Sequence, residues 1–227
     1  MPTIDALKDF ADQFKRVSEA ATKLDENANV VTFLVNNRNL VKFVLDGGAK
    51  TVDDLATLLR RPGMTQDLLV NLLTKESLTI SEIRSTIVKG VPAETHELPE
   101  AIRFGALEGG GEFEFFGNSQ GVEGVFRPTN KQGVETPVSL KSFHDVSSLG
   151  SLPREIRRNS NQAQAVGIEN AIFYGEPIQF NTNQLADFAT NGPIYQQIVQ
   201  DGAFSKIILK GSDGIVEITR SGVRIIK

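Results

Sequence analysis

The spacing of apolar residues changes near residue 100, and this change constrains the fold more than any other feature of the chain. Before residue 90 apolar residues recur three or four positions apart, as they do along one face of an α-helix. Glu112-Phe113-Glu114-Phe115 instead alternates strictly, which is typical of a half-buried strand. The sequence therefore predicts an all-helical N-terminal part followed by a domain that combines strands and helices.

Five helices are expected in the N-terminal part. The apolar spacing predicts helices over residues 3–26 and 29–45. The second of these is apolar on most sides, so we expect it to be the central helix. Thr51, Thr65 and Thr79 can each accept a hydrogen bond at a helix start, which predicts three further helices.

The boundary between the two parts is expected near residue 98. Residues 91–101 place several charged residues between two prolines, a composition typical of a linker. No strand-like alternation comes before residue 90. The predicted domains are therefore residues 1–98, a helical domain with its linker, and residues 99–227.

The second part alternates between strand and helix patterns. Gly211-Ser212-Asp213-Gly214 joins two strand-like runs and predicts a hairpin. The order of patterns predicts an α+β fold with a small, mainly antiparallel sheet and packed helices. The expected strands cover residues 112–115, 121–126, 137–143, 170–174, 204–209, 215–219 and 223–226, and the expected helices cover residues 153–166, 182–191 and 194–199.

Composition excludes several kinds of site. The chain has no Cys and only two His among its 227 residues, which rules out disulfides, thiolate metal sites and multi-His metal sites. It also lacks a Walker loop, a dinucleotide fingerprint and a nucleophile elbow, so neither a metal ion nor a cofactor is expected. No apolar run approaches the roughly 20 residues of a membrane span, and the N-terminus has no signal-peptide pattern.

The formal net charge of −4 argues against a broad nucleic-acid-binding surface. A smaller basic patch lies on the helix expected near residues 153–166. Arg154, Arg157 and Arg158 share one face of that helix because they are spaced three and four apart, and Asn161 extends the face. Phosphate contact is a natural use of such a patch, and a solvated helix surface is the alternative.

Glu123 and His144 are candidates for acid–base chemistry. Glu123 is the acid in a short apolar run flanked by glycines, where a carboxylate can lie in a cleft. His144 follows the next expected strand, and a His can act as a general base near neutral pH. A structural role for Glu123 and a surface position for His144 are the alternatives.

The strand expected over residues 137–143 supplies a third set of candidates. Its alternation places Ser139 and Lys141 on one face, with Ser142 at the end of the run. An ammonium can stabilise a developing phosphorane, and a hydroxyl can orient a phosphate. The alternative is that this face is simply solvated.

From about Gly121 to Ile218 the sequence resembles the C-terminal toxin domains of bacterial polymorphic and contact-dependent inhibition toxins. Many such domains are similar to the barnase, EndoU, colicin and RelE-type ribonuclease fold, in which helices pack on a small antiparallel sheet. The resembling pieces are Val122-Glu123-Gly124, the run 137–142, the Asn- and Gln-rich segment 158–163, the strand 170–174, the helix around 185–188 with its end at 191–194, and the hairpin end at 214–218.

The resemblance implies an antibacterial toxin effector that cleaves RNA, such as tRNA, without a metal ion or cofactor. The 2′-hydroxyl would attack the neighbouring phosphate, a base would take its proton, and cations would stabilise the phosphorane. In this interpretation the stabilising cations are Lys141 and Arg157 or Arg158, the base is His144 or Glu123, and the substrate-binding residues are Ser139, Ser142, Arg154 and Asn161.

Such a toxin would be secreted or delivered from a cell surface and would act in the cytoplasm of a target cell. The expected partners are a cognate immunity protein and the RNA substrate, with contact to a membrane or a delivery apparatus through the N-terminal helices. Two alternatives stay open. The chain could be a non-catalytic helical docking or adaptor protein, or a toxin with other chemistry such as ADP-ribosyl transfer.

Overall fold

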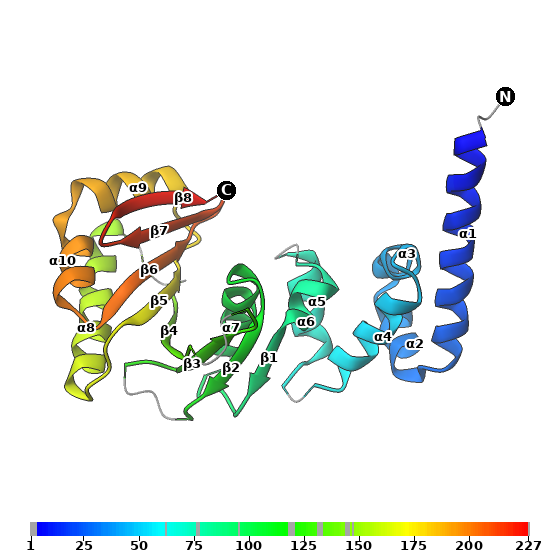
Figure 1. Ribbon diagram of the computed structural model, residues 1–227, viewed down its shortest axis with the longest axis horizontal. Helices are drawn as coiled ribbons and strands as arrows, with labels where there is room; N and C mark the ends of the chain where they lie inside the picture. The colour runs from blue at the N-terminus through cyan, green and yellow to red at the C-terminus, as the bar shows by residue number, and fades with distance from the viewer. Residues whose placement is uncertain are drawn as a thin grey trace. The chain divides into compact units, whose positions relative to one another are not determined.

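The chain folds into two compact units, Met1–Arg84 and Ser85–Lys227. The computed structural model describes residues 4–61, 63–75, 78–94, 96–117, 121–130, 134–143, 146 and 148–226. In the described residues the first unit is helical, whereas the second combines a sheet with helices, which agrees with an α+β fold (Figure 1). No helix among the described residues combines the length and apolarity needed to cross a bilayer.

The first unit is built from short amphipathic helices whose apolar faces meet. Phe33, Leu55 and Leu58 are fully buried in its core. The Thr65 hydroxyl accepts a hydrogen bond from the Leu68 N–H at 3.1 Å, which confirms the expected helix start there. The elements are α1 (Ile4–Asp25), α2 (Ala28–Asn36), the 3₁₀ turn η1 (Arg38–Leu40), α3 (Val41–Asp46), α4 (Gly48–Leu59), α5 (Gln66–Thr74) and α6 (Ile80–Ser85).

The single central helix expected over residues 29–45 is wrong. The helix α2 ends at Asn36, and the side-chain amide of its C-cap residue Asn37 donates to the Phe33 carbonyl at 2.9 Å. Asn side chains compete with the helix for backbone hydrogen bonds, which explains the break. Val35 and Phe43 are 59% and 44% exposed, so apolar composition alone did not indicate burial on all sides.

Among the described residues, an eight-stranded mixed sheet forms the centre of the second unit, with its strands in sequence order. The pairs β1–β2, β4–β5 and β5–β6 are parallel, and the other four are antiparallel. The strands are β1 (Thr86–Lys89), β2 (Gly111–Phe115), β3 (Gly124–Pro128), β4 (Thr136–Ser142), β5 (Ala171–Glu176), β6 (Phe204–Lys210), β7 (Ile215–Thr219) and β8 (Gly222–Ile226). The helices are α7 (Glu97–Leu107), α8 (Leu152–Ala165), α9 (Thr182–Asn191) and α10 (Pro193–Asp201), with the turn η2 (Leu149–Ser151) before α8.

Helices cover both faces of this sheet. On one face, α7 packs through Phe104 against Phe126 and Tyr174, with ring centroids 5.2 and 5.8 Å apart. On the other face, Phe173 and Phe204 belong to a core shared with α8, α9 and α10. Figure 1 shows these three helices beside the β4–β8 part of the sheet. Because successive residues of β5 point to opposite faces, Phe173 and Tyr174 enter different cores.

Three expectations for this part of the chain need correction. Residues 86–89 form a strand and 97–107 form a helix, where the sequence predicted a helix end and a linker. Glu97, the first residue of α7, accepts hydrogen bonds from the N–H groups of Ala93 and Glu94 at 2.7 and 3.2 Å, so its buried carboxylate holds the turn before the helix rather than lying in a solvated linker. The sequence boundary between the two compact units follows Arg84 rather than residue 98.

The third correction concerns the sheet, which is larger and more parallel than expected. Sequence order suggested hairpins, because strand patterns follow one another closely. α7, α8 and the α9–α10 pair instead act as crossovers, and crossover helices join parallel strands. The six residues of β5 are all buried, which is typical of a parallel strand covered on both faces.

Candidate functional site

Charged and hydroxyl side chains from four segments gather where α7 packs against the ends of β4 and β5. Two come from α7, one from the residue before β3, one from β4 and two from β5. We call this set the charged cluster, and its members are Glu100, Arg103, Glu123, Lys141, Tyr174 and Glu176.

Lys141 is the member of the charged cluster that solvent can reach, and it pairs with Glu123. The Glu123 Oε1 atom accepts a hydrogen bond from the Lys141 Nζ atom at 2.5 Å, and its Oε2 atom accepts from the Leu140 N–H at 2.6 Å. The Glu123 side chain is 1% exposed, whereas that of Lys141 is 28% exposed. A buried, anchored carboxylate therefore holds an ammonium group that solvent or a ligand can reach.

The local chain path explains why Glu123 takes this position. Gly121 has φ +88°, and a Cβ there would lie 2.4 Å from the Ala163 backbone nitrogen, so only Gly fits the approach to α8. Two residues later the Glu123 N–H donates to the Val138 carbonyl at 2.9 Å. Gly121, one of the glycines predicted to flank a cleft, thus allows the chain to pass close to α8 and to place the Glu123 backbone beside β4.

Arg103 and Glu176 form the most enclosed ion pair of the charged cluster. The Arg103 Nε and Nη2 atoms lie 2.5 and 2.7 Å from the two Glu176 carboxylate oxygens, so the pair is bidentate. The Tyr174 hydroxyl donates to Glu176 Oε1 at 2.8 Å. Burial, with the adjacent Glu176 charge, raises the pKa of Tyr174 well above its usual range, so this hydroxyl stays protonated.

Glu100 is the acid of the charged cluster that lacks a matched cation. Its side chain is 1% exposed, and its Oε2 atom accepts no hydrogen bond from the described residues. The Nε2 atom of His96, one helical turn earlier, lies 3.9 Å from that oxygen. Burial raises the pKa of Glu100 to about 9, with Glu176 and Glu123 adding to the increase and Arg103 and Lys141 opposing it.

The balance of charge defines what this arrangement can do. Glu123 is paired with Lys141, and Glu176 with Arg103, which leaves Glu100 as a third carboxyl. Glu100 is therefore a neutral acid at neutral pH, and it can ionise when a further cation comes close. No group of three or more His, Asp or Glu side chains in the described ranges is arranged to hold a metal ion by itself.

Ser139 and Ser142 lie on β4, on either side of the residues that contact Glu123. Ser139 is fully buried beside Phe173 of β5, and its hydroxyl has no hydrogen-bond partner among the described residues. Ser142 is half-buried at the end of the strand, opposite Glu176. His144, expected just after this strand, lies outside the described residues.

Arg154, Arg157, Arg158 and Asn161 are exposed on α8, as the helix pattern predicted. Arg157 donates to Gln197 of α10 at 3.4 Å, and Arg158 lies 3.9 Å from Glu155. No contact found among the described side chains joins these four residues to Lys141. A groove of 450 Å³ between α8 and α10 includes Arg157 and Asn161 in its lining, together with Ser160, Gln164, Gln197 and Asp201.

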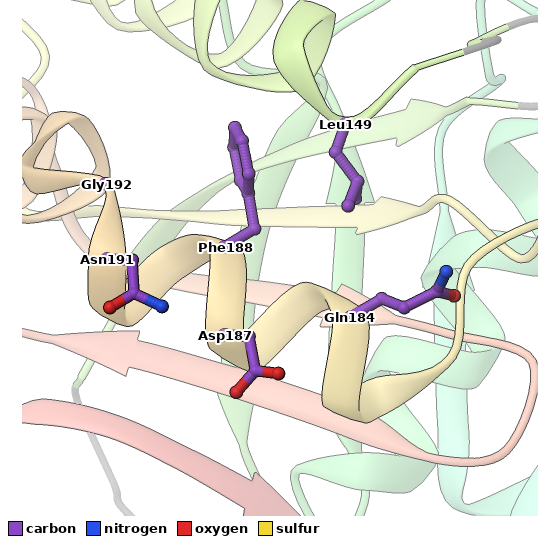
Figure 2. A pocket seen from close by; sticks show the side chains of 6 residues that line it. All are labelled: Leu149, Gln184, Asp187, Phe188, Asn191 and Gly192. Atoms are coloured by element: carbon purple, nitrogen blue, oxygen red, sulfur yellow. The ribbon is translucent and has the colours of Figure 1, made fainter.

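A second pocket, of 480 Å³, lies along α9 and contains none of the predicted site residues. Figure 2 shows Phe188 on the side of α9 toward Leu149, with Asp187 and Asn191 extending on the other side. None of the described residues that line this pocket is basic, so these residues offer nothing to neutralise a phosphate.

Sequence reasoning missed Glu100, Arg103 and Glu176. Glu100 was assigned to the linker of residues 91–101 and Arg103 was given no role, although their spacing of three places them on one face of a helix. Glu176 ends a strand whose residues are otherwise apolar, aromatic or Gly, and an acid at the end of a buried strand was the available signal.

No protein-family model matches the chain, and neither a curated protein nor a solved structure does. The functional assignment therefore depends on the geometry of the charged cluster and on the sequence resemblance described above.

Proposed function

We propose that this chain is an antibacterial toxin effector whose second unit cleaves phosphodiester bonds of nucleic acid at the charged cluster. The contact between Lys141 and Glu123 carries the proposal. It places a partly exposed ammonium on a buried carboxylate, and the charges of both groups act on a second buried acid, Glu100. An ammonium fixed in this way can stabilise the negative charge that develops on a phosphate.

Hydrolysis at the cluster could be assisted by a divalent cation such as Mg²⁺, which would take the place of the proton on Glu100. Mg²⁺ is commonly held by one or two carboxylates, several waters and substrate phosphates, so Glu100 and Glu123 would be sufficient protein ligands. The unpartnered Oε2 atom of Glu100 fits this role, because it is a buried acceptor without a donor among the described residues. A bound divalent cation lowers the pKa of a coordinated water and neutralises phosphate charge.

The residues of the chain then have distinct tasks. Glu100, once ionised, and Glu123 would hold the cation. Lys141 would donate to the phosphate, and Glu123 determines where the ammonium lies. In this mechanism water would attack the phosphorus and lose a proton to the solvent, and the departing sugar oxygen would take up a proton from the solvent. The substrate needs no 2′-hydroxyl, so either RNA or DNA could be cut.

Metal-independent cleavage of RNA, which the resemblance implies, is the alternative mechanism. It would combine Lys141 with Arg157 or Arg158 and with Glu123 or His144 as base. The exposure of the arginines and the groove beside Arg157 support a place for RNA there. This mechanism requires a 2′-hydroxyl and proceeds in EDTA, so it is experimentally distinct from the first.

The toxin role also implies delivery and a protecting partner. We propose a cognate immunity protein as that partner, and the cytoplasm of a target cell as the place of action. On the first unit, Phe14, Val35 and Phe43 are 69%, 59% and 44% exposed. Exposed apolar side chains of this kind support contact with a membrane or a delivery apparatus.

Inducible expression of the full chain in bacteria, with growth and total RNA and DNA followed, tests the proposal. The wild-type chain should arrest growth and degrade nucleic acid, and Lys141→Ala should relieve both effects. Lys206→Ala is the matched control, because Lys206 is 23% exposed and pairs with Glu108 at 2.9 Å outside the charged cluster. This control should remain toxic.

Two outcomes would point elsewhere. Intact RNA and DNA in arrested cells would indicate another toxin chemistry, such as ADP-ribosyl transfer. A folded chain that causes no arrest would favour the docking or adaptor interpretation.

A further inference from the structure

We infer that Arg103 is a positioning residue, which acts through Glu176 and Tyr174 to fix Glu100 in the charged cluster. The inference rests on the proposed function, because it concerns the orientation of a carboxylate that would bind the cation. It assigns a task to three buried polar residues that the proposed chemistry itself does not use.

The geometry around Glu176 is restrictive. Both of its carboxylate oxygens contact the Arg103 guanidinium, and one also accepts the Tyr174 hydroxyl. The side chains of Arg103 and Glu176 are 12% and 3% exposed. A planar guanidinium in bidentate contact with a buried carboxylate permits little rotation, so it fixes the local position of α7 relative to β5.

Glu100 depends on this arrangement because it lies one helical turn before Arg103. Residues three apart on a helix share a face, so a contact that fixes α7 at Arg103 also fixes the backbone position from which the Glu100 side chain extends. The charges of Glu176 and Arg103 both act on Glu100, and they act in opposite directions. The Arg103–Glu176 pair therefore sets both the place and the electrostatic surroundings of the Glu100 carboxyl.

A purely structural role would be the simpler interpretation, but α7 has other anchors. Phe104 packs edge-on against Phe126 and Tyr174, and Ala101 is fully buried in the same core. Buried ion pairs often add no net stability compared with apolar side chains of similar volume. Apolar contacts can hold α7 on the sheet, so the ion pair is available for the precise placement of Glu100.

Two substitutions disturb the positioning in different ways. Arg103→Lys keeps the positive charge but loses the two-pronged contact with Glu176. Glu176→Gln leaves the guanidinium without its carboxylate, so it can pair with Glu100 and compete with a cation. Both changes should weaken cation binding. Loss of a residue that orients a metal ligand typically costs about 10- to 100-fold in affinity or activity.

The experiment uses the full chain and Mg²⁺ alone as the probe. Tyr174 and Tyr195 are the only tyrosines and the chain has no Trp, so tyrosine fluorescence reports unfolding of the second unit. The increase of its unfolding midpoint with MgCl₂ gives a binding readout that is independent of catalysis. Nucleic-acid cleavage measured against MgCl₂ gives the half-saturating concentration and the maximal rate separately.

We expect Arg103→Lys and Glu176→Gln to raise the half-saturating Mg²⁺ concentration by about 10-fold or more in both readouts. Arg127→Lys is the matched control. Arg127 also bridges carboxylates, those of Glu112 and Glu114, but these residues alternate with Phe113 and so point away from α7. The control should keep the wild-type Mg²⁺ dependence.

The outcomes separate the positioning role from the proposed function. If the wild type responds to Mg²⁺ and both variants respond equally well, Arg103 does not position Glu100. If the wild type shows neither a midpoint shift nor cation-dependent cleavage, the proposed cation-assisted function fails, and the positioning role fails with it. Should Arg103→Lys not fold, Tyr174→Phe removes only one hydrogen bond to Glu176, and an unchanged Mg²⁺ dependence in that variant would equally overturn the inference.

Discussion

Replacing Glu100 with Gln should stabilise the second unit of the free protein and at the same time abolish its response to Mg²⁺. Glu100 is buried, and its Oε2 atom accepts no hydrogen bond from the described residues. Gln has nearly the same shape and is neutral at every pH. The substitution therefore removes the cost of burying an acid, together with the negative charge that a cation requires.

The pKa of Glu100 gives the size of this effect. It is about 9 in the folded protein, compared with an ordinary value of 4.5. Between these values the folded state binds one more proton than the unfolded chain, so stability is full below pH 4.5 and falls as pH rises toward 9. Each pH unit removes about 1.4 kcal/mol, and at pH 7.5 the total is at most about 4 kcal/mol.

Urea unfolding followed by tyrosine fluorescence, in EDTA and at several pH values, measures the effect. The free-energy difference between Glu100→Gln and the wild type should be near zero close to pH 4.5 and should grow steadily toward pH 8. Glu112→Gln is the control with the opposite sign, because Lys89 and Arg127 lower the pKa of Glu112. A Glu100→Gln variant no more stable than the wild type at pH 7.5, or a difference independent of pH, would refute the reasoning.

Three further predictions test other parts of the account. Ser139→Ala should leave cleavage unchanged and should keep or slightly increase the stability against urea, because the buried hydroxyl has no partner among the described residues. A tenfold loss of cleavage would instead show that Ser139 binds substrate. Gly121→Ala should destabilise the second unit by about 2 kcal/mol or more in the same urea assay, because φ is +88° and a Cβ would clash with the Ala163 backbone, and a neutral result would contradict this fit. Phe33→Ala should cost about 3–5 kcal/mol in the first unit, seen as a lower midpoint of the helical circular-dichroism signal, and an unchanged midpoint would mean that Phe33 is not in a core.

The elements with strict periodicity were predictable from the sequence, and those fixed by tertiary contacts were not. The alternation in residues 112–115 and the turn sequence at 211–214 are local patterns that predict a strand and a hairpin. The structure has β2 at the first and the β6–β7 pair at the second. The charged residues at the start of segment 97–107 gave it the composition of an exposed linker. The structure instead buries Glu97 and Glu100, which composition does not indicate. Parallel pairing could not be predicted from local patterns either, because each crossover joins strands that are distant in sequence.

The candidate site was predictable only where a short sequence pattern carried it. Glu123 and Lys141 were selected from separate strand patterns, and the structure brings them within 2.5 Å of each other. Glu100, Arg103 and Glu176 reach that pair only through the packing of α7 on the sheet, which no local pattern encodes. The arginines of α8 were identified correctly as one exposed face, but a helical face alone does not specify which site it serves.

Cleavage of RNA and DNA by the purified full chain, with either MgCl₂ or EDTA, tests the central claim most directly. The account predicts cleavage in MgCl₂ that falls on the order of 10²- to 10³-fold in Lys141→Ala, by analogy with the loss of one charge-stabilising donor, while Lys206→Ala keeps the wild-type rate. Cleavage of RNA alone, undiminished in EDTA, would replace the cation-assisted mechanism with the metal-independent one. Equal cleavage by the wild type and Lys141→Ala, or no cleavage of either nucleic acid by the folded wild type, would contradict the assignment of the charged cluster as a nuclease site.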